Sequence, residues 1–360
     1  MTTVRLPIGP QHPLLKEPLS LQIDVAGEQI SEATVRIGYV HRGIEELTRC
    51  RSYVQNVHLI ERICGICSHI HSTTYCQAVE ALLGIEIPPR AAALRVLLCE
   101  LERIHSHLLW IGVLGEAIGF TTIFMYAWRD RELVLDIMER LSGGRVSHAA
   151  NIIGGVRVDL GAEEIALIEQ TLDTLETRLS LYRDLMVHDR PFRLRTQGIG
   201  RLSLETVQAL GIVGPTARAT GVDVDMRRDA PYAGYGGLSF RVIVGSEGDV
   251  WSRADVRQQE IAQSLSLCRQ AIRALPEGDL AVRAPARVPE GEVVTRTEAP
   301  RGELIYYVRS DGSDRPARLK IRTPTLPALM SLAGLLRGVQ AADLPVVIAG
   351  FDLCIACADR

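Results

Sequence analysis

Residues 61–71 read ERICGICSHIH, and residues 351–360 read FDLCIACADR. Each stretch contains a Cys-x-x-Cys pair, Cys64 with Cys67 and Cys354 with Cys357. This spacing allows two thiolates to bind one metal ion. The two pairs of a zinc ribbon usually lie about 15–20 residues apart, whereas these pairs lie almost a chain length apart. A metal bound by both pairs would therefore lie inside the fold. A structural zinc site and a redox disulfide remain alternatives.

The composition is typical of a large globular protein that does not bind nucleic acid. The chain has 360 residues, of which 47% are hydrophobic and 23% are charged, and its net charge is -3. Because basic and acidic residues nearly balance, no electrostatic nucleic-acid surface is indicated. The first residues, MTTVRLPIGPQHPLLKEP, contain no signal-peptide-like apolar run, and no apolar stretch reaches the about 18 residues of a membrane span. We expect the eight cysteines to be reduced thiols in the cytoplasm.

The hydrophobic pattern predicts a mainly helical α+β protein. Apolar residues alternate on both sides of a turn at 27–28, which indicates a small N-terminal sheet within 4–40. Helical spacing predicts one long helix that begins at Pro89. It predicts three more at 129–141, 162–187 and 256–275. The apolar stretch 108–128 reads as a single buried helix.

The remaining segments are predicted from Gly, Pro and turn signals. They comprise two short helical pieces within 191–250, a loop at 276–300, a hairpin of 303–309 with 317–322, and a last helix at 327–339. We expect a single domain, 1–360. It would consist of an N-terminal β region at 1–43, a bundle of long helices at 44–275 and a C-terminal α/β region at 276–360.

The two cysteine motifs resemble the N-terminal and C-terminal signatures of the large, catalytic subunits of nickel–iron hydrogenases. Other stretches resemble the energy-converting, membrane-linked branch (group 4), which includes ferredoxin-dependent and CO-induced hydrogenases. They are IGPQHPLLKEP, HRGIEEL, ELERIHSHL, residues 143–156, APRGEL and RTPTLPAL. The resemblance covers essentially the whole chain. It differs in one respect, because Leu353 stands where the family usually has Pro, which puts the rigidity before Cys354 in question.

The resemblance implies a nickel–iron centre on the four cysteines. Cys64 and Cys354 match the terminal nickel ligands, and Cys67 and Cys357 match the thiolates that bridge nickel to iron. CO and cyanide complete the iron coordination in the family. The family's large subunits lose a C-terminal extension, so we expect the mature form to end at the motif's last residue.

Three further residues match groups beside this centre in the family. Glu17 matches a buried glutamate that transfers protons, although from the sequence alone it reads as a surface residue next to Pro18. Arg301 matches an arginine directed at the open metal position; otherwise it is a loop arginine in a salt bridge. Asp352 is expected to pair with Arg301.

The resemblance also assigns supporting residues around the centre. His71 matches the signature histidine beside a bridging sulfur. Thr325 matches a residue that hydrogen-bonds a cyanide, with Thr323 as an alternative. Glu45 matches a ligand of a magnesium-type ion. His105 and His107 lie two apart on a helix and make a poor ligand pair, and the single cysteines read as small buried hydrophobic residues: Cys50, Cys76, Cys99 and Cys268.

The expected function is reversible interconversion of protons and H₂ with an acceptor of the ferredoxin type. No cysteine set is left for iron–sulfur clusters, so electrons would pass through a small subunit carrying a 4Fe–4S cluster. That pair would bind other hydrophilic and membrane subunits of an ion-pumping complex, on the cytoplasmic side of the membrane. The alternatives are a quinone-site scaffold like the 49-kDa-type subunit of respiratory complex I, which lacks the four cysteines, and a structural zinc protein.

Overall fold

The computed structural model describes residues 3–360, and it confirms a mainly helical α+β protein. The N-terminal sheet contains β1 (Thr3–Ile8), β2 (Ser20–Ala26) and β3 (Gln29–Arg36), which pair antiparallel in the order β1-β2-β3. Leu21, Ile23 and Val25 alternate on the buried face of β2, as a sheet with one solvent-exposed face requires. The predicted N-terminal sheet is therefore confirmed.

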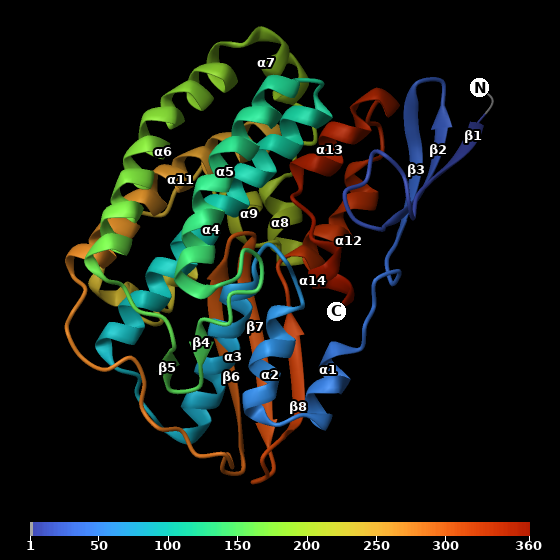
Figure 1. Ribbon diagram of the computed structural model, residues 1–360. Coiled ribbons are helices and arrows are strands. Elements are labelled where there is room, and N and C mark those ends of the chain that lie inside the picture. The colour runs from blue at the N-terminus through green and yellow to red at the C-terminus, as the bar shows by residue number, and fades with distance from the viewer. Residues whose placement is uncertain (1–2) are drawn as a thin grey trace.

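Long helices form the centre of the molecule (Figure 1). Helix α4 (Pro89–Ala117) packs along α5 (Thr121–Ser142) and α11 (Val250–Arg273), and α6 (Ala162–His188) packs on α5 and α11. Pro89 opens α4, because the first turn of a helix needs no proline N–H. The prediction of one helix over 108–128 is wrong. The chain turns between α4 and α5 at Gly119, whose φ of 82° favours glycine.

Shorter elements surround this bundle. They are α1 (Ile44–Leu47), η1 (Thr48–Cys50), α2 (Tyr53–Glu61), α3 (Ser68–Leu83), β4 (Asn151–Ile152), β5 (Gly155–Val156), α7 (Arg190–Thr196), α8 (Leu204–Leu210), α9 (Gly214–Arg218), α10 (Met226–Asp229) and η2 (Tyr235–Gly237). The segment 191–250 thus contains more short helices than the two predicted.

The C-terminal third begins with the antiparallel sheet β6 (Gly291–Ala299), β7 (Gly302–Ser310) and β8 (Pro316–Arg322). The predicted hairpin is β7 with β8. The prediction of a loop throughout 276–300 is wrong, because 291–299 is strand β6. Two of its three exposed residues are charged, Glu292 and Arg296 beside Val294, and its burial comes from packing on α3, which no local pattern reveals.

The N-terminal sheet lies beside the last helices of the chain (Figure 1). The last helices are α12 (Thr325–Leu335), η3 (Ala341–Asp343), α13 (Leu344–Gly350) and α14 (Ile355–Asp359). Helix α12 packs on β3, and the Ile30 N–H donates to the Val339 carbonyl at 2.9 Å. Apolar residues of β2, β3, α12 and α13 form one hydrophobic core, while the long helices and the second sheet form a larger one. Within residues 3–360, no helix is long and apolar enough to cross a membrane.

Candidate metal centre

The four cysteines of the two pairs meet in the protein interior. Cys64 Sγ lies 3.4 Å from Cys354 Sγ, Cys67 Sγ lies 3.5 Å from Cys357 Sγ, and the sulfurs of Cys354 and Cys357 are 3.1 Å apart. All four side chains are buried. Two thiolates that share a metal at the usual distance of about 2.3 Å lie roughly 3.3–3.8 Å apart. The Cys64–Cys354 and Cys67–Cys357 separations fall in this range, and the Cys354–Cys357 separation is slightly shorter.

Each pair lies where a helix begins. Cys64 is in the turn between α2 and α3, and Cys67 is the residue before the first turn of α3. Cys354 takes the same place before α14. The Ile66 N–H donates to Cys64 Sγ at 3.3 Å. This N–H group and the nearby positive end of α3 favour thiolate over thiol at Cys64.

The donor atoms fall into two overlapping groups. One contains Cys64, Cys354 and Cys357, and the other contains Cys67, His71 and Cys357. Hydrogen bonds from Cys354 and then Cys357 hold the pKa of Cys64 well below its usual range, while the hydrogen bonds to Cys354 and Cys64 raise that of Cys357. One buried thiolate therefore suppresses ionisation of its neighbours. Four thiolates can coexist here only with metal cations, so the residues fit a soft, multiply charged metal group.

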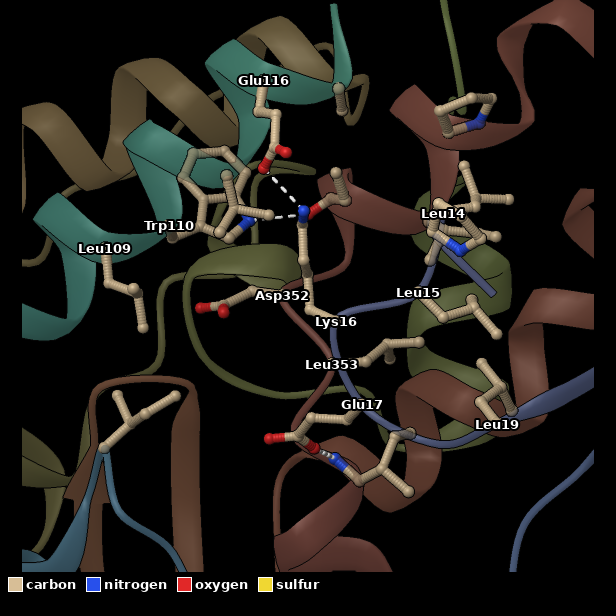
Figure 2. A pocket seen from close by; sticks show the side chains of 18 of the residues that line it. Leu14, Leu15, Lys16, Glu17, Leu19, Leu109, Trp110, Glu116, Asp352 and Leu353 are labelled. Carbon is tan, nitrogen blue, oxygen red and sulfur yellow. Dashed lines mark hydrogen bonds and ion pairs between the residues drawn. The ribbon is translucent and has the colours of Figure 1, made fainter. Parts of the chain in front are cut away.

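Glu17 comes from the segment between β1 and β2, yet it lies against the C-terminal motif (Figure 2). Its Oε1 is 3.8 Å from Cys354 Sγ, and its Oε2 accepts hydrogen bonds from the N–H groups of Ile355 and of Ala356, the latter at 2.9 Å. Burial raises the pKa of Glu17, opposed by the Ala356 N–H. The reading of Glu17 as a solvated surface residue does not hold.

Arg301 lies in the tight turn from β6 to β7 and is buried. Its Nε donates to the Asp352 carbonyl at 2.9 Å, and its guanidinium lies 2.8 Å from Asp352 Oδ1. The predicted pairing of these two residues is confirmed. Burial disfavours the charged guanidinium, but Asp352 and then Cys354 keep the pKa of Arg301 well above its usual value. The charge is thus permanent.

Two glycines allow this turn to reach the centre. A Cβ on Gly214 would lie 2.2 Å from the Arg301 carbonyl oxygen, and a Cβ on Gly302 would lie 2.7 Å from the Gly214 backbone. Both glycines have positive φ values, 73° and 129°. Helix α9 and the β6–β7 turn can approach each other this closely only where both backbones lack side chains.

His71 and the two candidate threonines lie around the second cysteine pair. His71 Nε2 is 3.6 Å from Cys357 Sγ, and its Nδ1 is 2.6 Å from the Tyr306 hydroxyl on β7. Burial lowers the pKa of His71 to about 4, so the ring is neutral. Thr325 Oγ1 accepts from the Cys354 N–H at 3.2 Å, and Thr323 Oγ1 donates to the Cys357 carbonyl at 3.3 Å. Tyr306 carried no sequence signal, because its role depends on pairing with a residue 235 positions away.

Glu45 lies apart from the thiols, in an ion-pair network. Its carboxylate binds Lys320, accepts from the Ile321 N–H at 3.1 Å and lies 2.9 Å from Arg360 Nε. Two cations therefore already balance this carboxylate. A divalent ion at Glu45 would have to displace at least one of them.

An apolar cavity of about 270 Å³ leads from the surface towards Glu17, Arg301 and Asp352. Figure 2 shows Lys16 and Glu116 at one side of it, and their side chains pair at 2.6 Å while remaining half-exposed. Leu353, the residue that departs from the family pattern, also lines this cavity. No sequence pattern indicates the cavity, because its walls come from segments far apart in the chain.

The histidines and cysteines that were not assigned to the metal centre lie mostly where the sequence predicts. His107 Nε2 pairs with Glu260 at 2.9 Å rather than with His105. Cys76, Cys99 and Cys268 are buried among apolar residues, but Cys50 is exposed, so the prediction of a buried residue is wrong there. Cys50 ends the short 3₁₀ helix η1 on the surface. A three-residue element is too short to show a repeating pattern of apolar residues, so the sequence does not reveal which of its side chains are exposed.

Comparison with known proteins agrees with these observations. Residues 42–182 match the model described as nickel-dependent hydrogenase, and residues 117–287 and 281–360 match that of the 49 kDa subunit of respiratory-chain NADH dehydrogenase. The chain is 41% identical to a carbon monoxide-induced hydrogenase of Rhodospirillum rubrum, over all of both chains. It is 40% identical to the alpha subunit of a membrane-bound hydrogenase of Pyrococcus furiosus, over 99% of this chain and 87% of that one. It is 37% identical to one of the subunits of the NADH-quinone oxidoreductase of Geotalea uraniireducens, over 98% of this chain and 97% of that one. The chain therefore belongs to the family that comprises the nickel-dependent hydrogenase large subunits and the related 49 kDa subunits of the respiratory NADH dehydrogenases.

Proposed function

We propose that this chain is the catalytic subunit of an energy-converting nickel–iron hydrogenase, which interconverts H₂ with two protons and two electrons. The observation that carries the proposal is the convergence of four buried thiols from the two ends of the chain. A quinone-site scaffold has no use for such a cluster, whereas a bound metal allows all four thiols to ionise together.

In this proposal, Cys64 and Cys354 would be the terminal ligands of nickel, and Cys67 and Cys357 would be the thiolates shared with an iron that also carries CO and cyanide. The two donor groups share only the Cys357 sulfur, which supports a bridging role for Cys357. When bound, the nickel–iron group supplies the two-electron chemistry of hydrogen, which amino-acid side chains do not provide.

The surrounding residues then have separate tasks. Glu17 exchanges protons with the Cys354 sulfur, because its partly buried carboxylate lies 3.8 Å from that sulfur. Arg301 supplies a fixed positive charge beside the thiolates, and Asp352 orients it. His71 would support the Cys357 sulfur, and Thr325, or alternatively Thr323, would hydrogen-bond a cyanide ligand of iron.

Electrons need a partner. Of the four cysteines outside the centre, Cys50 is exposed while Cys76, Cys99 and Cys268 are isolated and buried. We therefore propose a small subunit with a 4Fe–4S cluster and an acceptor of the ferredoxin type. Membrane subunits would hold the pair on the cytoplasmic face. We also retain a magnesium ion at Glu45 as a proposal, on condition that it displaces Lys320 or Arg360.

The second candidate is a quinone-site scaffold. The apolar cavity beside Glu17 favours it, since ligand sites are concave and mostly apolar, and one relative is named as part of an NADH-quinone oxidoreductase. In that function the cavity would hold the quinone and the thiols would remain without metal.

Metal analysis combined with infrared spectroscopy of the purified complex separates the two functions. We expect nickel and iron, together with CO and cyanide bands and H₂-dependent dye reduction. Cys354→Ala should lose nickel and activity, since no neighbouring donor replaces the thiolate. Cys99→Ala, a buried cysteine outside the cluster, should keep both. Absence of nickel and of CO bands in the wild-type complex would leave the quinone scaffold as the better assignment.

A further inference from the structure

Asp352 is held between two arginines. Its Oδ1 lies 2.8 Å from the Arg301 guanidinium, and its Oδ2 lies 3.6 Å from the guanidinium of Arg257 on α11. Asp352 also has a φ of 54°, a conformation that non-glycine residues adopt at a cost. We propose that Arg257 is a positioning residue for the Arg301–Asp352 pair and gives this side of the centre its net positive charge. The inference rests on the proposed function.

Arg257 is fixed in place by contacts other than Asp352. Its guanidinium lies 4.2 Å from the centre of the Trp110 ring, a cation–π contact, and its NH1 donates to the Arg253 carbonyl at 3.2 Å. Trp110 is itself held, because its Nε1 donates to the Ala349 carbonyl at 2.7 Å. Ala349 lies three residues before Asp352, and the Asp352 N–H donates to its carbonyl at 3.1 Å. Trp110 thus ties Arg257 on α11 to the segment that carries Asp352 (Figure 2 shows Trp110 and Asp352).

The charges around this segment explain why a second arginine matters. Arg301 and Asp352 together are neutral, so their pair presents a dipole rather than a net charge to the thiolates. The charge of Glu260 on the same helix also acts on Arg257, but Glu260 is paired with Arg218 at 2.9 Å and with His107. Arg257 therefore leaves an excess of one positive charge on the Arg301–Asp352–Arg257 group. A buried charge acts strongly on neighbouring buried groups, because little solvent screens it.

Arginine suits this position better than lysine for holding Asp352, whereas either residue supplies the charge. The planar guanidinium stacks on Trp110 and at the same time keeps one nitrogen 3.6 Å from Asp352 Oδ2, as an ion pair without a hydrogen bond. A lysine would keep the charge and lose the stacking plane. The two contributions can thus be separated by substitution.

The test uses the assembled complex and compares Arg257→Met and Arg257→Lys with Arg253→Met. Arg253 is the matched control. It is buried one turn earlier on α11, stacks on Phe351 and donates to the carbonyls of Gly200 and Gly248, without an ion pair to Asp352. The readouts are nickel and iron content, the positions of the CO and cyanide infrared bands, and the kcat and KM for H₂.

At equal metal content, Arg257→Met should shift the CO and cyanide bands to lower wavenumber, because a buried positive charge is lost and more electron density stays on iron. Its kcat should fall about tenfold, less than the ~10²-fold for a donor in direct contact, with KM little changed. Arg257→Lys should keep the wild-type bands and recover part of the kcat. Arg253→Met should leave the bands in place.

Unshifted bands in Arg257→Met, or an equal shift in Arg253→Met, would overturn the inference. If Arg257→Met does not retain nickel, Arg257→Lys decides alone: displaced bands at full metal content would refute the charge assignment. A wild-type complex without CO or cyanide bands would instead refute the proposed function, so the two failures are distinguishable.

Discussion

Replacing Glu17 by Gln tests whether this carboxylate carries protons between the thiols and the solvent. The amide keeps the shape and one oxygen acceptor for the N–H groups of Ile355 and Ala356, to which the carboxylate now binds. It cannot release or accept a proton at this position. Because burial raises the pKa of Glu17 above its usual value, the carboxylate is well suited to alternate between its two protonation states, and the substitution removes that alternation alone.

The size of the effect follows from the geometry. Positioned acid–base groups contribute about 10²–10⁴-fold to rate, and Glu17 Oε1 lies 3.8 Å from the Cys354 sulfur. Glu17→Gln should therefore lose about 10²-fold or more of H₂ turnover. Glu17→Asp withdraws the acid by one carbon–carbon bond, about 1.5 Å, beyond hydrogen-bond reach of sulfur unless the segment moves. We expect intermediate activity.

The assay is H₂ evolution together with H/D exchange, measured at equal nickel content and with CO and cyanide infrared bands as a check of the centre. Glu116→Gln is the matched control, because Glu116 lines the same cavity but pairs with Lys16 at 2.6 Å near the surface. Wild-type turnover in Glu17→Gln would refute the assignment, as would an equal loss in Glu116→Gln. The proton path would then have to begin elsewhere.

Three further expectations concern charge. Arg301→Lys keeps the charge but loses the planar contact with Asp352, so turnover should fall by ~10²-fold with metals retained; near-normal turnover would make Arg301 structural. If magnesium binds Glu45, millimolar Mg²⁺ should raise the unfolding temperature of the wild type and not of Glu45→Gln, whereas identical responses would exclude the ion. Finally, although burial opposes ionisation, Arg218 holds the pKa of Glu260 at about 2, against about 4.3 in an unfolded chain. This depressed carboxyl stabilises the fold above that unfolded pKa, by roughly 3 kcal/mol, and the contribution disappears as pH falls through about 2. Urea unfolding should show weaker acid sensitivity in Glu260→Gln, and unchanged sensitivity would contradict the assignment.

Local patterns in the sequence determined much of the secondary structure. The long helices α4, α6 and α11 follow from apolar residues at helical spacing, and β7 with β8 follows from two alternating runs around a turn. Such patterns are local because one face of each element must be buried. The same reasoning failed at β6, because two of its three exposed residues are charged and its burial depends on α3.

The sequence also determined the donor set, since Cys-x-x-Cys pairs and their flanking residues are readable without coordinates. Only the tertiary structure brought Cys64 to Cys354 across 290 positions and placed Glu17 against the same motif. It also decided that Glu45 meets Arg360, and that Arg257 meets Asp352. These contacts join segments that are far apart in the chain, and such contacts leave no repeating pattern in the sequence. They are fixed by how the helices and sheets pack to bury apolar surface, and that packing is a property of the whole chain.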